Sequence, residues 1–249
     1  MGNPGRKAVS TLLPDLVKEH NLDFVIANAE NAAGGSGITP KVAQELFAAG
    51  VDALTSGDHI WKKRDIFEII DREERILRPL NFPGEPPGRG YGIFKKKDKV
   101  LGVINLQGRV FMEALECPFR RARQAQEEMI KQTKVILVDM HAEATSEKIA
   151  MGWYLDGLVS AIVGTHTHIQ TADEKILPGG SAYITDVGMT GPYDSVIGRQ
   201  TEDVLQRFLT AVPTRFEVAS ENVQLHGVLL DLDEDSGKAK AITRVQRKV

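Results

Sequence analysis

The order of apolar and polar positions changes between the two halves of the chain. In the first half, short apolar runs alternate with longer segments that carry one apolar stripe, whereas the second half holds mostly runs of alternating apolar and polar residues. Short apolar runs between turn residues are typical of buried strands, and apolar residues three and four positions apart indicate a helix. This order predicts an α/β fold with two packed sheets and helices on the outside.

The helices are predicted from the stripes and from residues that favour a helix start. The first stripe contains Pro14, which we expect to kink or divide the helix. Thr39 suits an N-cap and Pro40 a first helical position, and we expect Thr145 to cap another helix with Glu147 in its first turn. We expect helices at 8–17, 39–50, 62–72, 120–132, from 145 onward, and at 203–209.

The strands are predicted from the short apolar runs and, late in the chain, from the alternating ones. We expect a loop at 79–92, which holds four of the eleven prolines, and a hairpin turn at 233–237. We expect strands at 22–27, 51–55, 100–106, 135–138, 160–163, 182–185, 215–218, 223–232 and 239–245.

Composition adds few constraints. The 249 residues are 42% hydrophobic and show no internal repeat or linker, so we expect one domain over residues 1–249. The net charge of −3 offers no general attraction to nucleic acid or to an anionic membrane, and no apolar run reaches the length of a membrane span. Cys117 is the single cysteine, which excludes an intrachain disulfide and favours a cytoplasmic location.

Two histidines follow the apolar run at 160–163. The run breaks at Gly164, and His166 and His168 come next. In extended backbone, residues two apart project to the same side. Two neutral imidazoles on one side of a strand end are suitable ligands for a transition metal.

Matching ligands follow other predicted strands. Glu30 and Asn31 follow one strand, Asp58 and His59 the next, and His141 a third. The carboxyl ends of strands in α/β sheets gather at one edge, so we expect these side chains to meet His166 and His168. Mixed nitrogen and oxygen ligands suit Mn, Fe or Zn, and two such ions about 3.5–4 Å apart can clamp a phosphoryl oxygen and generate hydroxide from water.

Five motifs occur in a familiar order. They are Asn-Ala-Glu-Asn-Ala-Ala-Gly-Gly at 28–35, Gly-Asp-His at 57–59, His-Ala-Glu-Ala-Thr-Ser-Glu-Lys at 141–148, Gly-Thr-His-Thr-His at 164–168 and Thr-Asp-Val-Gly-Met-Thr-Gly-Pro at 185–192. Together they closely resemble the YmdB-like metallophosphoesterases. The resemblance implies a four-layer αββα sandwich with two mixed sheets. It also implies hydrolysis of phosphodiesters, including cyclic nucleotides, by hydroxide held on two metal ions.

The resemblance also implies a role for each candidate residue. Glu30 would bridge two divalent metals, with Fe or Mn favoured and Mg or Zn also suitable. Asn31 and His168 would serve the first metal, and Asp58, His141 and His166 would serve the second. His59 would be the general acid near the leaving oxygen. The implied substrate is a small nucleotide phosphodiester. We expect a homo-oligomer without a membrane or stable nucleic-acid partner.

The sequence departs from the family pattern at two places. The family normally opens with a strand that ends in Gly-Asp-Ile just before the Gly-Asn-Pro-Gly-Arg found here at 2–6, so we expect that strand and its metal-binding aspartate to be missing. Asp58 stands where asparagine is common, which is a mild change because a carboxylate is a good ligand. We therefore expect the second metal to bind more tightly than the first.

Other interpretations stay open at this point. An incomplete metal site favours a non-catalytic regulator that binds nucleotide or RNA. An amidohydrolase also uses His-x-His, but usually on the first strand of a barrel, whereas this motif lies two-thirds along the chain. Arg89 and Arg109 are candidates to meet a phosphate, and we expect Asp186 to cap backbone more readily than to bind metal.

Overall fold

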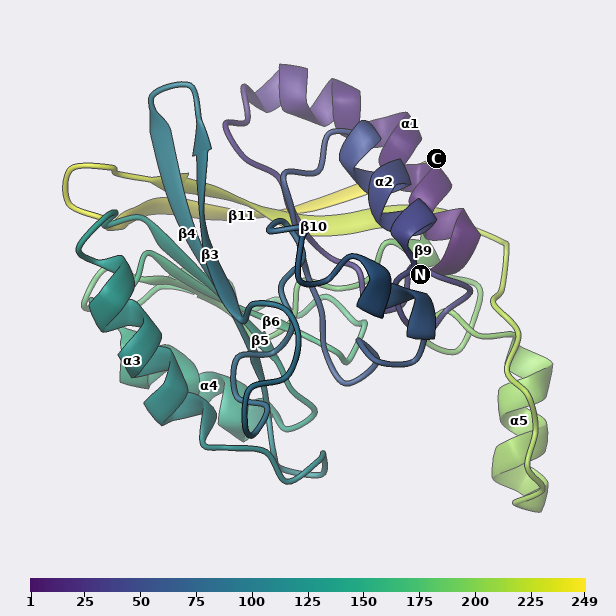
Figure 1. Ribbon diagram of the computed structural model, residues 1–249. Coiled ribbons are helices and arrows are strands. Elements are labelled where there is room, and N and C mark those ends of the chain that lie inside the picture. Colours follow the sequence, from purple (N-terminus) through teal and green to yellow (C-terminus); the bar gives the residue numbers. More distant parts are fainter.

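The computed structural model describes residues 1–249 and arranges them in four layers (Figure 1). The larger sheet has six strands in the order β3-β4-β5-β6-β8-β7. Strands β4, β5, β6 and β8 are parallel, whereas β3 and β7 are antiparallel strands at the two edges. The bounds are Tyr91–Lys96 for β3, Lys99–Gln107 for β4, Ile136–His141 for β5, Ala161–Thr165 for β6, Lys175–Ile176 for β7 and Ala182–Ile184 for β8.

The second layer consists of two groups of strands. Strands β1 (Ile26–Asn28) and β2 (Ala53–Thr55) pair in parallel. Strands β9 (Gly191–Pro192), β10 (Val223–Leu232) and β11 (Ala239–Lys248) form an antiparallel group with β10 in the middle. Both groups pack on one face of the larger sheet through a shared apolar core that includes Val103, Leu137, Val163, Ile26 and Leu230.

Helices cover the two outer faces. The helices α3 (Pro118–Met129) and α4 (Thr145–Leu155) bury their apolar sides against the free face of the larger sheet. On the opposite side, α1 (Gly2–His20) and α2 (Pro40–Ala48) pack over β1, β2 and β10. The layers are therefore helix, sheet, sheet and helix, which confirms the predicted αββα fold. None of the helices combines the length and the apolar composition that crossing a lipid bilayer requires.

Most predicted elements are present, and several differ. Residues 62–72 form only a short 3₁₀ helix, η1 (Arg64–Glu68). Residues 215–218 form no strand and make a single bridge between Val218 and Arg199. Strand β3 was not predicted, because its residues are half-buried or exposed and lack a clear alternation. It exists because a tight turn at Lys97, with φ 57°, folds it back on β4.

Helix starts were predicted with mixed success. The Thr39 hydroxyl accepts a hydrogen bond from the Val42 amide at 3.3 Å, as expected of an N-cap. Thr145 is instead the first helical residue of α4, and Ala144 precedes it without a side-chain cap. Glu147 does lie in that first turn, where it accepts hydrogen bonds from the backbone of Arg109. The carboxylate therefore ties α4 to the loop after β4.

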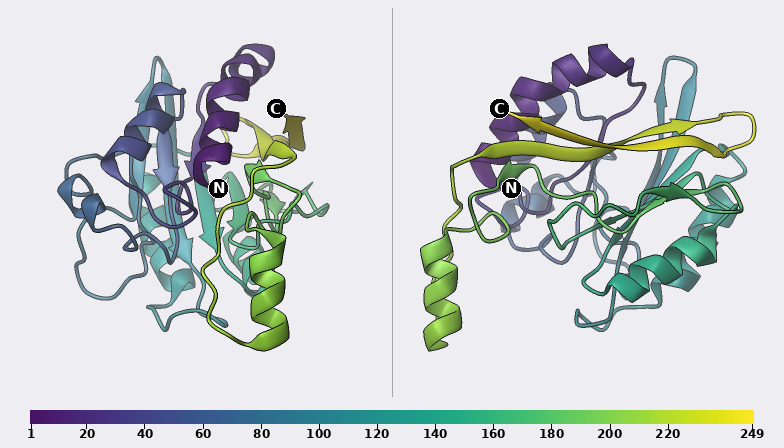
Figure 2. Two further views of the ribbon diagram at one scale, coloured as in Figure 1. Left: turned by 90° about the vertical axis from the view of Figure 1, so that its right-hand side faces the viewer. Right: turned by 180° about the vertical axis from the view of Figure 1, so that it is seen from behind.

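Helix α5 (Thr201–Thr210) stands away from the four layers in Figure 1 and in the right-hand view of Figure 2. Val204 is its single buried residue. The helix begins shortly after the loop that follows β9, and the chain then returns to the body as β10.

Candidate metal centre

The carboxyl ends of β1, β2, β5 and β6 bring four metal-ligating side chains together. Glu30, Asp58, His141 and His166 each offer a ligand atom, and these atoms lie within 4.8 Å of one another. They meet because β1 runs parallel to β2 and β5 parallel to β6, so each loop leaves its sheet at the same edge. Two carboxylates and two imidazoles form a donor set that suits a divalent transition metal.

The ligand atoms converge closely. His141 Nε2 lies 3.1 Å from Asp58 Oδ1 and 3.2 Å from Glu30 Oε2. His166 Nδ1 lies 3.0 Å from the same His141 nitrogen. Two imidazole nitrogens this close are held either by one proton in an N–H···N hydrogen bond or by a shared metal ion. The geometry of these four side chains therefore fits a metal site.

A chain of hydrogen bonds orients His141. Its Nδ1 lies 3.0 Å from the Thr165 hydroxyl, which donates to Asp139 Oδ1 at 2.7 Å. The buried Asp139 carboxylate also accepts hydrogen bonds from Thr55 and Asn28. Because Nδ1 holds its proton toward Thr165, Nε2 is free to act as the ligand atom. Asp139 is a charged residue inside an apolar run, and that was the available sequence signal for this role.

Asn31, His59 and His168 form an adjoining group. His59 Nδ1 lies 2.8 Å from Asn31 Oδ1, and Asn31 Nδ2 donates to Glu30 Oε1 at 2.9 Å. His168 Nδ1 donates to the Ile197 carbonyl at 2.9 Å, which leaves its Nε2 facing Asn31 at 3.2 Å. Asn31 thus presents its NH₂ toward Glu30 and His168. The Asn31 amide must turn over before its oxygen can bind a metal ion on that side.

The two histidines of the His-x-His motif diverge, which contradicts the predicted extended arrangement. Strand β6 ends at Thr165, and His166 and His168 have φ values of 99° and 67°. The cause is Thr167, whose amide and hydroxyl both donate to Asp186 Oδ2, at 3.1 and 2.7 Å. Consequently His166 faces Asp58 and His168 faces Asn31. Such positive φ values are uncommon outside glycine and concentrate at functional sites.

Asp186 is a structural residue of this turn. Its Oδ2 also pairs with Lys148 Nζ at 2.9 Å, and both side chains are fully buried. The prediction that Asp186 bonds backbone is confirmed by the Thr167 and Gly188 amides that donate to it. Lys148 was not predicted, although it lies in the motif at 141–148.

Three further residues near the cluster, Gly57, Glu143 and Gln107, were not predicted to belong to the site. A Cβ atom on Gly57 would overlap the His141 ring and the Glu30 carboxylate. Glu143 Oε2 lies 3.2 Å from His166 Nε2. Gln107, opposite His141 in the sheet, is fully buried and neither atom of its amide has a partner. Because buried polar groups are rarely unpartnered, Gln107 marks a place for a polar ligand or water.

Burial and neighbouring charges shift the pKa values of Glu30, Asp58 and His141 in opposite directions. Burial alone would lower the pKa of His141, but the charge of Glu30 and hydrogen bonds to Asp58 and Glu30 raise it to about 10. Burial would raise the pKa values of Glu30 and Asp58, but protonated His141 keeps both below their ordinary values. Burial lowers the pKa values of His166 and His168. Without metal, a proton on His141 holds the two carboxylates together.

This proton makes the stability of the metal-free protein depend on pH. The pKa of His141 is about 10 in the folded protein and 6.5 for an ordinary histidine of the unfolded chain, so the stabilisation is complete below about pH 6.5 and is lost as the pH rises toward 10. We expect the melting temperature of chelator-treated protein to fall over that interval, with a shallower slope in His141→Gln. The stabilisation gained from added Mn²⁺ should instead grow with pH, because histidine binds a metal ion as the neutral ring. Identical slopes in wild type and variant would refute this assignment.

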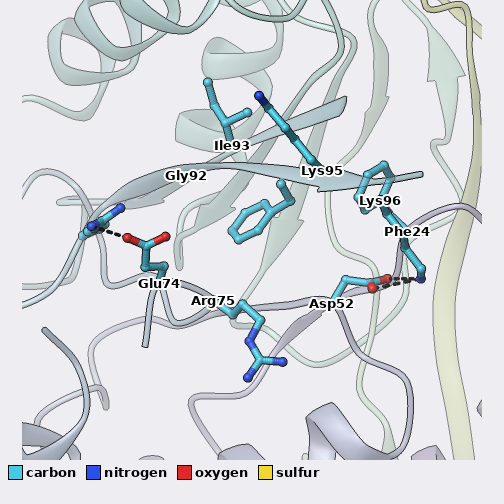
Figure 3. Close-up of a pocket in the computed structure, with 10 residues that line it drawn as sticks. Phe24, Asp52, Glu74, Arg75, Gly92, Ile93, Lys95 and Lys96 are labelled. Atoms are coloured by element: carbon cyan, nitrogen blue, oxygen red, sulfur yellow. Dashed lines mark hydrogen bonds and ion pairs between the residues drawn. The ribbon is translucent and has the colours of Figure 1, made fainter. Parts of the chain in front are cut away.

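A cavity of about 370 Å³ lies elsewhere, at the amino end of β2 (Figure 3). Two of its cations are already paired, Lys96 with Asp52 at 2.9 Å and Arg89 with Glu74 at 2.6 Å. Arg89 therefore lines this other cavity and pairs with Glu74, which agrees with a surface arginine and not with a phosphate contact at the ligand cluster. Arg109 lies at the correct edge, just after β4.

Two solved structures are closely similar to this chain, and a third shares its fold. A hypothetical protein from Thermus thermophilus superposes with a TM-score of 0.94 at 40% identity, covering 100% of this chain and 96% of that one. A novel phosphatase from Mycoplasma pneumoniae gives a TM-score of 0.92 at 34% identity, covering 99% and 90%. A putative 5'-nucleotidase from Staphylococcus aureus, at 14% identity and a TM-score of 0.58, shares the fold alone.

Sequence comparison agrees with the structures. The chain is 49% identical over 245 residues to a 2',3'-cyclic-nucleotide 2'-phosphodiesterase of Bacillus subtilis (strain 168), covering 98% of this chain and 93% of that protein. A family model described as YmdB-like protein matches residues 1–245. The resemblance carried by the five motifs is thereby confirmed, and the chain belongs to the YmdB-like protein family.

Proposed function

We propose that this protein is a metal-dependent phosphodiesterase that hydrolyses 2',3'-cyclic nucleotides or related small phosphodiesters. The observation that carries the proposal is the convergence of Glu30, Asp58, His141 and His166 within 4.8 Å at the carboxyl edge of the strands. The 49% identity to a Bacillus subtilis enzyme of that name supports the choice of substrate. The single cysteine is compatible with a cytoplasmic location, which we propose as well.

The proposed cofactor is a pair of divalent ions, Fe or Mn. When bound, such a pair polarises the phosphoryl group and activates water. Glu30 would serve both positions. Asp58, His141 and His166 would complete one, and His168 and Asn31 the other. Asp58, His141 and His166 lie close together, which supports tighter binding of the metal ion that they would hold. Asn31 must turn its amide before its oxygen can bind the other ion.

His59 is the proposed general acid. Its Nδ1 is engaged by Asn31 Oδ1, so the remaining nitrogen, Nε2, is the atom that can deliver a proton. That nitrogen lies 3.5 Å from Asp58 Oδ2. The side chain is partly exposed, as contact with a substrate requires. These contacts with Asn31 and Asp58 support His59 as the residue beside the site of cleavage.

Replacing His59 by alanine is expected to lower turnover about 10²–10⁴-fold on a cyclic nucleotide, with little change in bound metal. The loss should shrink on a nitrophenyl phosphodiester, because that leaving group needs little protonation. The assay compares wild type and variant on both substrates after loading with Mn²⁺. Equal losses on both would exclude the acid role. No turnover of either substrate by loaded wild type would exclude the phosphodiesterase itself.

A homo-oligomer is the proposed assembly, with α5 as its contact. The helix exposes Leu205, Phe208 and Leu209, the last two at 78% and 82%. Its first turn carries Glu202, and Arg207 lies near its end without an ion pair. Antiparallel pairing of two such helices across a two-fold axis would bury the apolar residues and bring these opposite charges together. A second copy of the chain is therefore a complementary partner for this surface.

Substituting serine for both Phe208 and Leu209 is expected to convert the oligomer to a monomer. Burying the exposed side chains is the driving force, at about 25 cal/mol per Å² of apolar surface. Light scattering coupled to size exclusion measures the mass. Ile149→Ser, an exposed position on α4, is the control and should leave the mass unchanged. A monomeric wild type would rule out this assembly.

A further inference from the structure

Phe111 is an aromatic residue that the fold leaves outside its core. Its side chain is 89% exposed and stacks on no other ring of the chain. It follows β4 in the segment Gly108-Arg109-Val110-Phe111, of which the last three residues are exposed. Single exposed apolar side chains are common on protein surfaces, so the backbone conformation and the anchoring of this turn are what set Phe111 apart.

The backbone at Phe111 is also unfavourable for this residue type. The Met112 amide donates to the Arg109 carbonyl at 3.3 Å, which closes a turn with Phe111 at its third position. Phe111 has φ 61° there, a conformation that favours glycine or asparagine. Neither turn propensity nor burial therefore accounts for an aromatic ring at this place.

The turn is held firmly beside the ligand cluster. The Gly108 amide donates to the carbonyl of His141 at 2.8 Å. The buried Glu147 carboxylate accepts from the amides of Arg109 and Val110 at 3.1 and 3.2 Å. Because β4 and β5 are parallel, with Gln107 opposite His141, this turn emerges at the same edge of the sheet as the loop after His141. The exposed ring is thus presented on a fixed base.

We propose that Phe111 binds the nucleobase of the substrate by stacking and that Arg109 contacts its phosphate. This inference rests on the proposed function, because it assumes a nucleotide at the metal centre. The Arg109 side chain is exposed and forms no ion pair, so its guanidinium is available to an anion. Stacking accepts any base, since every base has an aromatic face. The site would therefore distinguish nucleotides from base-free sugar phosphates without selecting one base.

The experiment measures binding of adenosine 3'-monophosphate and of ribose 5-phosphate by calorimetry in wild type, Phe111→Asn and Phe111→Tyr. Asparagine suits the turn but has no aromatic face. We expect Phe111→Asn to weaken binding of the nucleotide about tenfold, with ribose phosphate unaffected and the melting temperature unchanged or higher. Phe111→Tyr should restore nucleotide binding. Trp153→Asn, at another exposed aromatic residue, is the control and should bind as wild type does.

Two results would overturn the inference. One is equal weakening of both ligands in Phe111→Asn, and the other is nucleotide binding that is absent in wild type or unchanged in the variant. Hydrolysis of a cyclic nucleotide is measured on the same Mn²⁺-loaded samples. Base-dependent binding through Phe111 without any turnover would support the stacking role and reject the phosphodiesterase, so the two proposals fail separately.

Discussion

Replacing Glu30 by glutamine is expected to remove bound metal and to abolish hydrolysis of cyclic nucleotides. Glu30 is buried and contacts Asn31, His59 and His141, so it touches both groups of proposed site residues. Loss of an outer partner of a metal ligand typically costs 10–100-fold in affinity or activity, and loss of the shared carboxylate should exceed about 10²-fold. Glutamine keeps the volume, so the fold itself should persist.

Elemental analysis and the hydrolysis assay measure this effect. Glu128→Gln is the matched control, because Glu128 is an exposed carboxylate on α3 that pairs only with Lys131. The control should keep full metal content and activity. Metal content in Glu30→Gln equal to that of wild type would mean that the carboxylate is not a ligand, and the assignment of the centre would fail.

Gly57→Ala is expected to be nearly as damaging, although it removes no ligand. The added methyl group would overlap the His141 ring and the Glu30 carboxylate, both of which are buried. Overpacking of this kind typically costs about 1–3 kcal/mol, and here relief requires that a proposed metal ligand moves. We expect a lower melting temperature together with loss of metal and of hydrolysis.

Gly227→Ala is the control for this variant. Gly227 lies in β10, and a methyl group there would meet no atom within 4 Å. Any general effect of glycine on backbone freedom should appear in both variants, whereas the loss of metal should appear only at position 57. Normal metal content in Gly57→Ala would show that the cluster has room that the structure does not indicate.

The sequence predicted those helices and strands whose apolar spacing is visible within the element itself. Buried strands such as β5 and the amphipathic stripe of α1 are readable from local spacing. Strand β3 was missed because its pairing with β4 depends on a turn at Lys97, not on apolar alternation. The strand predicted at 215–218 is absent because residues there have no ladder partner beyond one bridge.

The sequence predicted which residues meet at the candidate site but not how their side chains are arranged. Parallel strands gather their ends, so the meeting of Glu30, Asp58, His141 and His166 follows from topology. The divergence of His166 and His168 does not, because it depends on Asp186, which approaches from another strand end. Likewise, the exposure of Phe111 follows from how its turn is anchored on Glu147.

The ion pair between Lys148 and Asp186 determines how much of the structure must be transferred to build this site in another protein. Lys148 comes from α4, Asp186 follows β8, and together they hold the Thr167 turn that follows β6. Removing one partner would leave an uncompensated buried charge, which typically costs about 3–5 kcal/mol. A designer who transplants the His-x-His turn into another scaffold must therefore carry three neighbouring elements with it. The smallest transferable unit is a piece of tertiary structure, not a sequence motif.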